Sequence, residues 1–195
     1  PALIASADEA YFIGQHLDQY NHASRSAFDY YQRGLELDSG DYRCNLALAT
    51  LEYNRANFEQ AIAYADSALT RAHRLNINPQ CGKASLIRGC AYERLGNVEQ
   101  AYEDFYRATW SGNGKEGGFY GLARISSRQK KYQQALTFTE NSLTCNGANY
   151  HTIALKALLL HKLGQSEQSL NYIDLQLASY PLNYALYYLR FTVTG

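Results

Sequence analysis

Apolar and polar positions follow one another along this chain with a helical period. For example, Ala101, Phe105 and Ala108 follow one another at steps of four and three, and polar residues occupy most of the positions between them. Positions at these steps share one face of an α-helix, so the segment predicts an amphipathic helix with one buried face. The same spacing, rather than the alternation of a strand, recurs in the other segments, and only three prolines interrupt it. The sequence therefore predicts an all-α fold.

Small residues mark an internal repeat in these helical segments. Five segments of similar sequence carry a small residue at the equivalent place: Ala27, Ala61, Ala101, Ala135 and Ser169. The intervals between these residues are equal, except that the second interval is longer. A small residue at such a place lets two helix backbones approach closely, and a period of about 34 residues is typical of the tetratricopeptide repeat. The chain thus resembles a tetratricopeptide-repeat (TPR) protein. The resemblance implies a right-handed solenoid of about five helix-turn-helix repeats plus a terminal helix.

The repeat register gives boundaries within a single solenoid that spans residues 1–195. We expect repeats at about residues 5–40, 41–79, 80–114, 115–148 and 149–181, and an extra helix over residues 182–193. In the best-matching repeat, Gly96 is expected to end the first helix, because glycine accepts the left-handed conformation of such an end. The first repeat fits the register only if the turn near Asn21 holds one extra residue.

The longer interval, from Ala61 to Ala101, indicates that the second repeat is longer than its neighbours. We expect its second helix to run on through Arg71, His73 and Arg74 until residues 76–79, with the sequence N-I-N-P, break it. Loops accept added length at small entropic cost, so a tolerated insertion is the simpler interpretation. The alternative is that the protruding helix end is a contact device.

Several strings of the sequence resemble one particular TPR tract. They are D-Y-R-C-N-L-A-L at residues 41–48, L-T-R-A-H-R-L-N-I-N-P at 69–79 and A-Y-E-D-F-Y-R-A-T-W at 101–110, and Y-Y-Q-R-G-L-E-L-D-S-G-D at 30–41 fits the same tract. They are similar to large bacterial proteins in which a β-rich domain of unknown function, linked by hypothesis to sugar metabolism, precedes the repeats. The resemblance implies an accessory module and transfers no catalytic residue to these positions. Because the chain starts at Pro1 and contains no methionine, we also expect it to be a piece of a longer protein.

Charge and cysteine content narrow the choice of partner and compartment. The chain carries 18 basic and 18 acidic residues, so its bulk charge argues against nucleic acid or a membrane as a partner. It has no long apolar run that could span a membrane and no secretory signal. The four cysteines form no C-x-x-C pair, and we expect them to be reduced packing residues of a cytoplasmic protein: Cys44, Cys81, Cys90 and Cys145.

No arrangement of residues in the sequence indicates catalysis or a cofactor. The phosphate-binding, metalloprotease and serine-hydrolase motifs are absent, and the five histidines are dispersed. The glycine-rich stretch S-G-N-G-K-E-G-G at residues 111–118 is interpreted as a flexible loop between repeats rather than a nucleotide cradle. Trp110, just before it, is interpreted as a packed residue of the seam between helices, with a ligand platform as the alternative. We therefore expect a protein that is not an enzyme and has no cofactor, catalytic residue or metal site.

Function is expected on the inner curve of such a solenoid, which the first helix of each repeat lines. In the register above, the candidate lining positions include six basic residues but only two acidic ones, Glu9 and Glu93. Guanidinium groups bind carboxylates and phosphates through paired donors, and tyrosines beside them offer flat apolar contact. The candidate partner-binding groove consists of basic and tyrosine residues: Arg43, Tyr53, Lys83, Arg94, Tyr120, Arg124, Arg128 and Lys162.

Two classes of function are compatible with these positions. In the first, the chain is a protein–protein interaction scaffold whose basic groove, in which Arg94, Arg124 and Arg128 converge, binds an acidic peptide or partner domain. In the second, which the family resemblance implies, it is a non-catalytic accessory domain of a larger sugar-active bacterial enzyme. Another domain of the same chain and a second copy of the chain are further candidate partners. The arginines also have a structural interpretation, in which pairing with Glu93 or Glu99 holds neighbouring repeats together.

Overall fold

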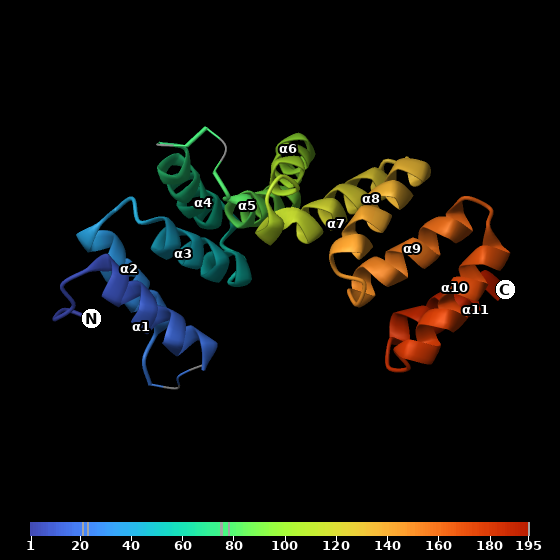
Figure 1. Cartoon of the computed structure of the whole chain (residues 1–195), viewed down its shortest axis with the longest axis horizontal. Helices are drawn as coiled ribbons and strands as arrows, with labels where there is room; N and C mark the ends of the chain where they lie inside the picture. Colours follow the sequence, from blue (N-terminus) through green and yellow to red (C-terminus); the bar gives the residue numbers. More distant parts are fainter. Residues whose placement is uncertain (21, 23, 75, 78, 195) are drawn as a thin grey trace. The chain divides into compact units, whose positions relative to one another are not determined.

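Every regular element in the described part of the chain is a helix. The structure is a computed structural model that describes residues 1–20, 22, 24–74, 76, 77 and 79–194. The predicted all-α fold is confirmed for these residues, and the expected extra residue near Asn21 and residue 78 of the expected helix break lie outside them. Eleven helices follow one another in this part (Figure 1): α1 (Ala7–Gln19), α2 (Ala27–Leu37), α3 (Tyr42–Asn54), α4 (Phe58–His73), α5 (Gly82–Arg94), α6 (Val98–Ala108), α7 (Gly112–Arg128), α8 (Tyr132–Cys145), α9 (Tyr150–Lys162), α10 (Ser166–Ser179) and α11 (Tyr184–Thr194).

Consecutive helices pack against each other in pairs, as helix-turn-helix repeats require. α1 packs on α2, α3 on α4, α5 on α6 and α9 on α10, and α11 is the predicted terminal helix. α7 and α8 are joined by the stacked rings of Phe119 and Phe138, whose centroids lie 6.4 Å apart. Four of the five small repeat positions have no exposed surface: Ala61, Ala101, Ala135 and Ser169. Small side chains at these places therefore allow the close helix contact that the sequence predicts.

The repeat period is also visible in the backbone of the turns. Ala56, Gly96, Lys130 and Gly164 have positive φ angles of 63°, 82°, 60° and 78°. Each lies shortly after the end of α3, α5, α7 or α9, and each precedes one of the last four small positions by the same distance along the chain. The predicted left-handed conformation of Gly96 is confirmed. In two other repeats a lysine and an alanine adopt the same conformation, although it is less favourable for a residue with a Cβ atom.

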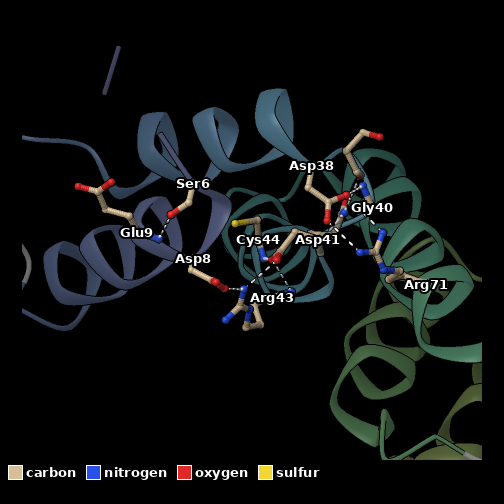
Figure 2. A network of polar contacts seen from close by, with 11 residues as sticks. Ser6, Asp8, Glu9, Asp38, Gly40, Asp41, Arg43, Cys44 and Arg71 are labelled. Carbon is tan, nitrogen blue, oxygen red and sulfur yellow. Dashed lines mark hydrogen bonds and ion pairs between the residues drawn. The ribbon is translucent and has the colours of Figure 1, made fainter. Parts of the chain in front are cut away.

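The helix before the long connection is extended, as predicted. α4 contains 16 residues, whereas α2 and α6 contain 11 each and α8 and α10 contain 14 each. It runs through Arg71 to His73, and Arg74 is its C-cap. Arg71 donates hydrogen bonds from Nη2 and Nη1 to the two carboxylate oxygens of Asp38, at 2.9 and 3.3 Å (Figure 2). This pair ties the extended end of α4 to the end of α2.

The glycine-rich stretch after Trp110 is helical, so its interpretation as a flexible loop is wrong. α7 begins at Gly112 and includes all four glycines of the stretch. A Cβ atom at Gly114 would lie 2.5 Å from the carbonyl carbon and oxygen of Gly82, at the start of α5. Glycine is therefore needed at this position because two backbones touch there.

By its contacts the chain divides into two compact units, Pro1–Gly114 and Lys115–Gly195. In the second unit, Leu186 anchors α11 against Ile153 of α9 and Ile173 of α10, and all three side chains are fully buried. None of the described helices combines the length and the apolar character that a membrane span needs.

Candidate partner-binding surfaces

Arg43, the first candidate groove residue, belongs to a network of polar contacts at the start of α3 (Figure 2). Asp41 caps this helix, because its Oδ1 accepts hydrogen bonds from the backbone N–H groups of Arg43 and Cys44, at 3.0 and 2.9 Å. Its Oδ2 accepts a further hydrogen bond from Arg43 Nη2 at 2.9 Å. Burial alone raises the pKa of Asp41, but these hydrogen bonds and the charge of Arg43 outweigh it and hold the pKa below its ordinary value.

The Arg43 guanidinium also reaches the first helix. It pairs with the Asp8 carboxylate of α1 and lies over the Tyr11 ring, 5.0 Å from the ring centroid. Its hydrogen bonds to Asp41 and Asp8 raise the pKa of Arg43 above its ordinary value. Arg43 thus has two carboxylate partners, and its contacts hold α1 against α3. This agrees with the structural interpretation of the arginines, although the carboxylates are not the expected glutamates.

Tyr53 and Arg94 lie in a second cluster of the first unit. The Tyr53 ring, at the end of α3, is 5.7 Å from the ring of Phe58 at the start of α4. The Arg94 guanidinium, at the end of α5, is 5.4 Å from the centroid of the same Phe58 ring. Lys83 is exposed in the first turn of α5, at the opposite end of the helix from Arg94. The structure therefore brings Tyr53 and Arg94 together through Phe58 and leaves Lys83 apart.

In the second unit, the candidates Tyr120 and Arg124 lie one turn apart on α7. The Arg124 guanidinium is 4.8 Å from the centroid of the Tyr120 ring. The Tyr120 ring stacks on the His151 ring of α9 at 6.5 Å, and His151 lies 4.2 Å from the ring of Tyr150. A ladder of aromatic rings beside a guanidinium therefore joins α7 to α9.

The remaining candidates are exposed at helix ends. Arg128 ends α7 and Lys162 ends α9. Arg94 belongs to the first unit, whereas Arg124 and Arg128 belong to the second. The convergence of these three arginines stays a prediction.

A cavity of about 1150 Å³ lies in the first unit, and sequence reasoning missed it. Its lining comes from the extended end of α4 and the connection after it, the start of α5 and the end of α6. Trp110 lines the cavity and is 65% exposed, so its interpretation as a packed seam residue is wrong. Its ring contacts that of Tyr106 edge to face, with 5.8 Å between the centroids. The longer second repeat and the lone tryptophan are the two sequence signals that point to this place.

An ion-pair network stands at one side of this cavity. Arg88 of α5 donates from Nε and Nη2 to the two carboxylate oxygens of Asp104 in α6, at 2.7 and 2.6 Å, and from Nη1 to Asp66 in α4. The Asp104 side chain is 3% exposed and that of Arg88 17%, so this pair is nearly withdrawn from water. Burial lowers the pKa of Arg88, but the two aspartates outweigh it and raise the pKa above its ordinary value. Arg88 therefore holds three helices together.

A second cavity, of about 610 Å³, lies in the second unit next to the aromatic ladder. It is formed by the start of α9 and the connection between α10 and α11. Its lining, which combines tyrosine rings with aliphatic side chains, suits an apolar side chain. The lining includes Tyr150, His151, Tyr180, Leu182 and Tyr184.

The four cysteines are free thiols that differ in exposure. Cys44 and Cys81 are buried, and Cys145 is exposed. Burial raises the pKa of the Cys44 thiol to about 12 and also raises that of Cys81, which makes both poor nucleophiles near neutral pH. Among the described residues, no group of three or more His, Cys, Asp or Glu side chains is placed to hold a metal ion.

No protein-family model matches the chain, but its fold is similar to several solved structures. PilW, described as a widely conserved type IV pilus biogenesis factor, is 17% identical with a TM-score of 0.75, over 92% of this chain and 80% of that one. PilF from Pseudomonas aeruginosa is 22% identical with a TM-score of 0.73, over 87% of this chain and 74% of that one.

YrrB, described as a TPR protein with an unusual peptide-binding site, is also similar. It is 14% identical with a TM-score of 0.66, over 92% of this chain and 89% of that one. The chain therefore has the TPR fold, and at these identities the likeness shows the fold alone.

Proposed function

We propose that the chain is a protein–protein interaction module in which the first helices of the repeats (α1, α3, α5, α7 and α9) contact a peptide or partner domain. TPR proteins are scaffolds for protein–protein interaction, and this chain has their fold. YrrB, of the same fold, is described as having a peptide-binding site. The observation that carries the proposal is that, in each unit, a guanidinium of one of these helices lies at an aromatic ring: Arg94 at the Phe58 ring, at the start of α4, and Arg124 at the Tyr120 ring of α7.

The proposed partner is an acidic segment with apolar side chains. In the first unit, the exposed Arg94 lies beside the Phe58 ring, which in turn contacts the Tyr53 ring. In the second unit, the half-buried Arg124 lies beside the Tyr120 ring. A guanidinium at a ring offers N–H donors to a carboxylate, while the ring offers flat apolar surface beside it. The remaining basic candidates add positive charge near the helix ends: Lys83, Arg128 and Lys162.

Arg43 is assigned a structural role within this proposal. Its guanidinium is already paired with Asp8 and Asp41. Binding a partner's carboxylate there would require breaking one of these pairs. The proposed contact surface of the first unit therefore centres on Tyr53 and Arg94, and Lys83 adds positive charge at the opposite end of α5.

A displayed peptide library tests this function. Selection on the wild-type chain is expected to enrich acidic peptides whose binding weakens as salt rises, because charge complementarity is screened. The combined variant Arg94→Glu, Arg124→Glu and Arg128→Glu is expected to bind them at least about tenfold more weakly, since charge-assisted hydrogen bonds are replaced by repulsion. The matched control makes the same change in charge outside these helices: Arg25→Glu, Arg74→Glu and Lys131→Glu.

Two outcomes would contradict the proposal. One is undiminished binding by the groove variant, and the other is an equal loss in the control. Circular dichroism and thermal melting show whether each variant is folded. The single variant Arg94→Glu, at an exposed position, provides the same comparison if the triple variant is unfolded.

The second function inferred from the sequence, an accessory domain of a larger sugar-active enzyme, rests on the family resemblance. No contact of the described residues favours it over the interaction module. We also propose that the chain is not an enzyme and needs no cofactor, and that it works in the cytoplasm, where its four thiols stay reduced.

A further inference from the structure

Two irregularities of the sequence meet at the cavity of the first unit. The longer second repeat extends α4 and the connection after it, and His73 and Pro79 of this segment line the cavity. The lone tryptophan, Trp110, lines the same cavity from the end of α6. The insertion therefore supplies part of a cavity wall, which favours the contact-device interpretation of the longer helix over a merely tolerated loop.

The wall that carries Trp110 is fixed by close contacts of the backbone. Ser111 Oγ accepts a hydrogen bond from the Gly82 N–H at 2.8 Å and donates one to Asn113 Oδ1 at 2.9 Å. The backbones of Gly82 and Gly114 also touch, as the 2.5 Å approach of a Cβ atom at Gly114 shows. These contacts hold the start of α7 on the start of α5, directly after Trp110. The wall is therefore preformed, and a ligand spends little free energy on ordering it.

The charges around the cavity are balanced except at one position. Arg88 is paired with both Asp66 and Asp104. Arg107 also lines the cavity, and among the described residues no ion pair joins it to a carboxylate. Asp104 does not itself line the cavity, so the lining holds two arginines and one aspartate. The cavity thus offers one unpaired guanidinium, which suits a single carboxylate better than a phosphate chain.

The unpaired guanidinium lies beside an exposed indole ring. Arg107 and Trp110 are one helical turn apart, because the Trp110 N–H donates to the Arg107 carbonyl at 3.1 Å. Leu69 and Pro79 add apolar surface to the same lining. The volume of about 1150 Å³ is above the roughly 300–1000 Å³ of small-molecule pockets, so a segment of polypeptide is the better match.

We propose that this cavity is a second protein-binding site, which takes a peptide segment of a partner carrying an aromatic residue next to an aspartate or glutamate. The aromatic side chain packs on Trp110, and the neighbouring carboxylate pairs with Arg107. The site is formed by α4, α5 and α6 of the first unit and uses none of the candidate groove residues. It is independent of the proposed function of the first helices.

The fluorescence of Trp110 reports on this site in the full chain, because the chain has no other tryptophan. The probes are the blocked tetrapeptides Gly-Phe-Asp-Gly and Gly-Asp-Phe-Gly, each with a counterpart in which asparagine replaces aspartate. We expect at least one acidic probe to change the fluorescence saturably below about 5 mM. It should bind about tenfold or more tightly than its asparagine counterpart, since a charge-assisted hydrogen bond is lost in the latter.

Two variants at exposed arginines complete the experiment. Arg107→Gln should abolish the difference between the aspartate and asparagine probes, whereas Arg74→Gln, beside the cavity but outside its lining, should preserve it. The proposal is overturned if no probe gives saturable binding, if both variants behave alike, or if free phenylacetate binds as tightly as the acidic probe. The last result would indicate a small-molecule site. The groove variant at Arg94, Arg124 and Arg128 should leave this binding unchanged, so the two proposals fail separately.

Discussion

At the scale of single residues, the turn inside each repeat imposes one backbone conformation on different side chains. Gly96 and Gly164 adopt the left-handed conformation, and so do Ala56 and Lys130 at the equivalent places. Glycine has no Cβ atom to clash there, whereas alanine and lysine have one. The turns of the second and fourth repeats are therefore less favourable than those of the third and fifth.

The substitution Lys130→Gly is expected to stabilise the chain. Relief of the left-handed strain outweighs the extra freedom of glycine in the unfolded chain, and we expect a gain of about 0.5–1 kcal/mol in the free energy of unfolding. The matched control is Gln134→Gly, because Gln134 is exposed inside α8, where glycine weakens the helix by up to about 1 kcal/mol. Urea unfolding measures both. A stabilising control, or a destabilising Lys130→Gly, would contradict this interpretation of the turns.

The ionised side chain of Asp41, which caps α3, makes the stability of the folded chain depend on pH, and the direction of its pKa shift fixes the sign of this dependence. The pKa of Asp41 is lowered in the folded chain, so its ionised form contributes stability above the pKa of the unfolded chain, near 3.8. That stability is lost as the pH falls through the lower, folded pKa. Asp41→Asn keeps a side-chain oxygen for the cap but has no charge to lose.

Thermal unfolding of wild type and Asp41→Asn over a series of acidic pH values tests this. We expect the wild type to be the more stable of the two near neutral pH, and the difference in melting temperature to shrink as the pH falls below about 4. A difference that stays constant with pH would show that the ionised carboxylate adds nothing to the cap.

At the scale of helices, short-range sequence patterns predicted which helices pair within each repeat. They did not predict contacts between residues that lie far apart along the chain. Small positions and turn glycines repeat along the sequence, so both could be predicted from spacing alone. The reason for Gly114 lies far away along the chain, at Gly82, and nothing in the local sequence distinguishes such a glycine from one in a flexible loop. The same limit applies to Arg43, whose partner Asp8 lies on another helix of the preceding repeat.

Two alanine substitutions in one glycine-rich stretch test the contact between α5 and α7. Gly114→Ala should destabilise the chain by about 2 kcal/mol or more, because its Cβ atom would meet backbone atoms that cannot turn aside. Gly112→Ala should be neutral or stabilising by up to about 1 kcal/mol, since nothing lies within 4 Å of its Cβ position. Chemical denaturation compares the two. Equal effects would mean that the stretch is a loose segment, as the sequence first indicated.

The candidate site was predictable only in part, because it too depends on contacts between residues that are distant in the sequence. The repeat register indicated which helices carry basic and tyrosine residues, but the partner of each side chain depends on the packing of other helices. Arg43 is thus engaged by carboxylates, whereas Arg94 lies at an aromatic ring. The cavity at Trp110 needs three helices and an insertion together, and no motif encodes such a combination.

At the scale of the whole molecule, the proposed binding falls on two kinds of surface. The first helices of the repeats carry arginine beside aromatic rings in both units. The cavity of the first unit, between second helices and the start of α5, carries Arg107 and Trp110. A repeat fold allows two separate binding surfaces, because different sets of its helices can face different partners.

Photo-crosslinking of a selected acidic peptide tests most directly whether the first helices bind the partner. The peptide carries a photoreactive group, and the chain carries Arg107→Gln so that the cavity does not compete. Mass spectrometry then identifies the labelled residues. We predict labelling of α1, α3, α5, α7 or α9 that is lost in the Arg94→Glu, Arg124→Glu and Arg128→Glu variant. Labelling confined to α2, α6, α8, α10 or α11, or to the part of α4 after Phe58, would contradict binding at the first helices.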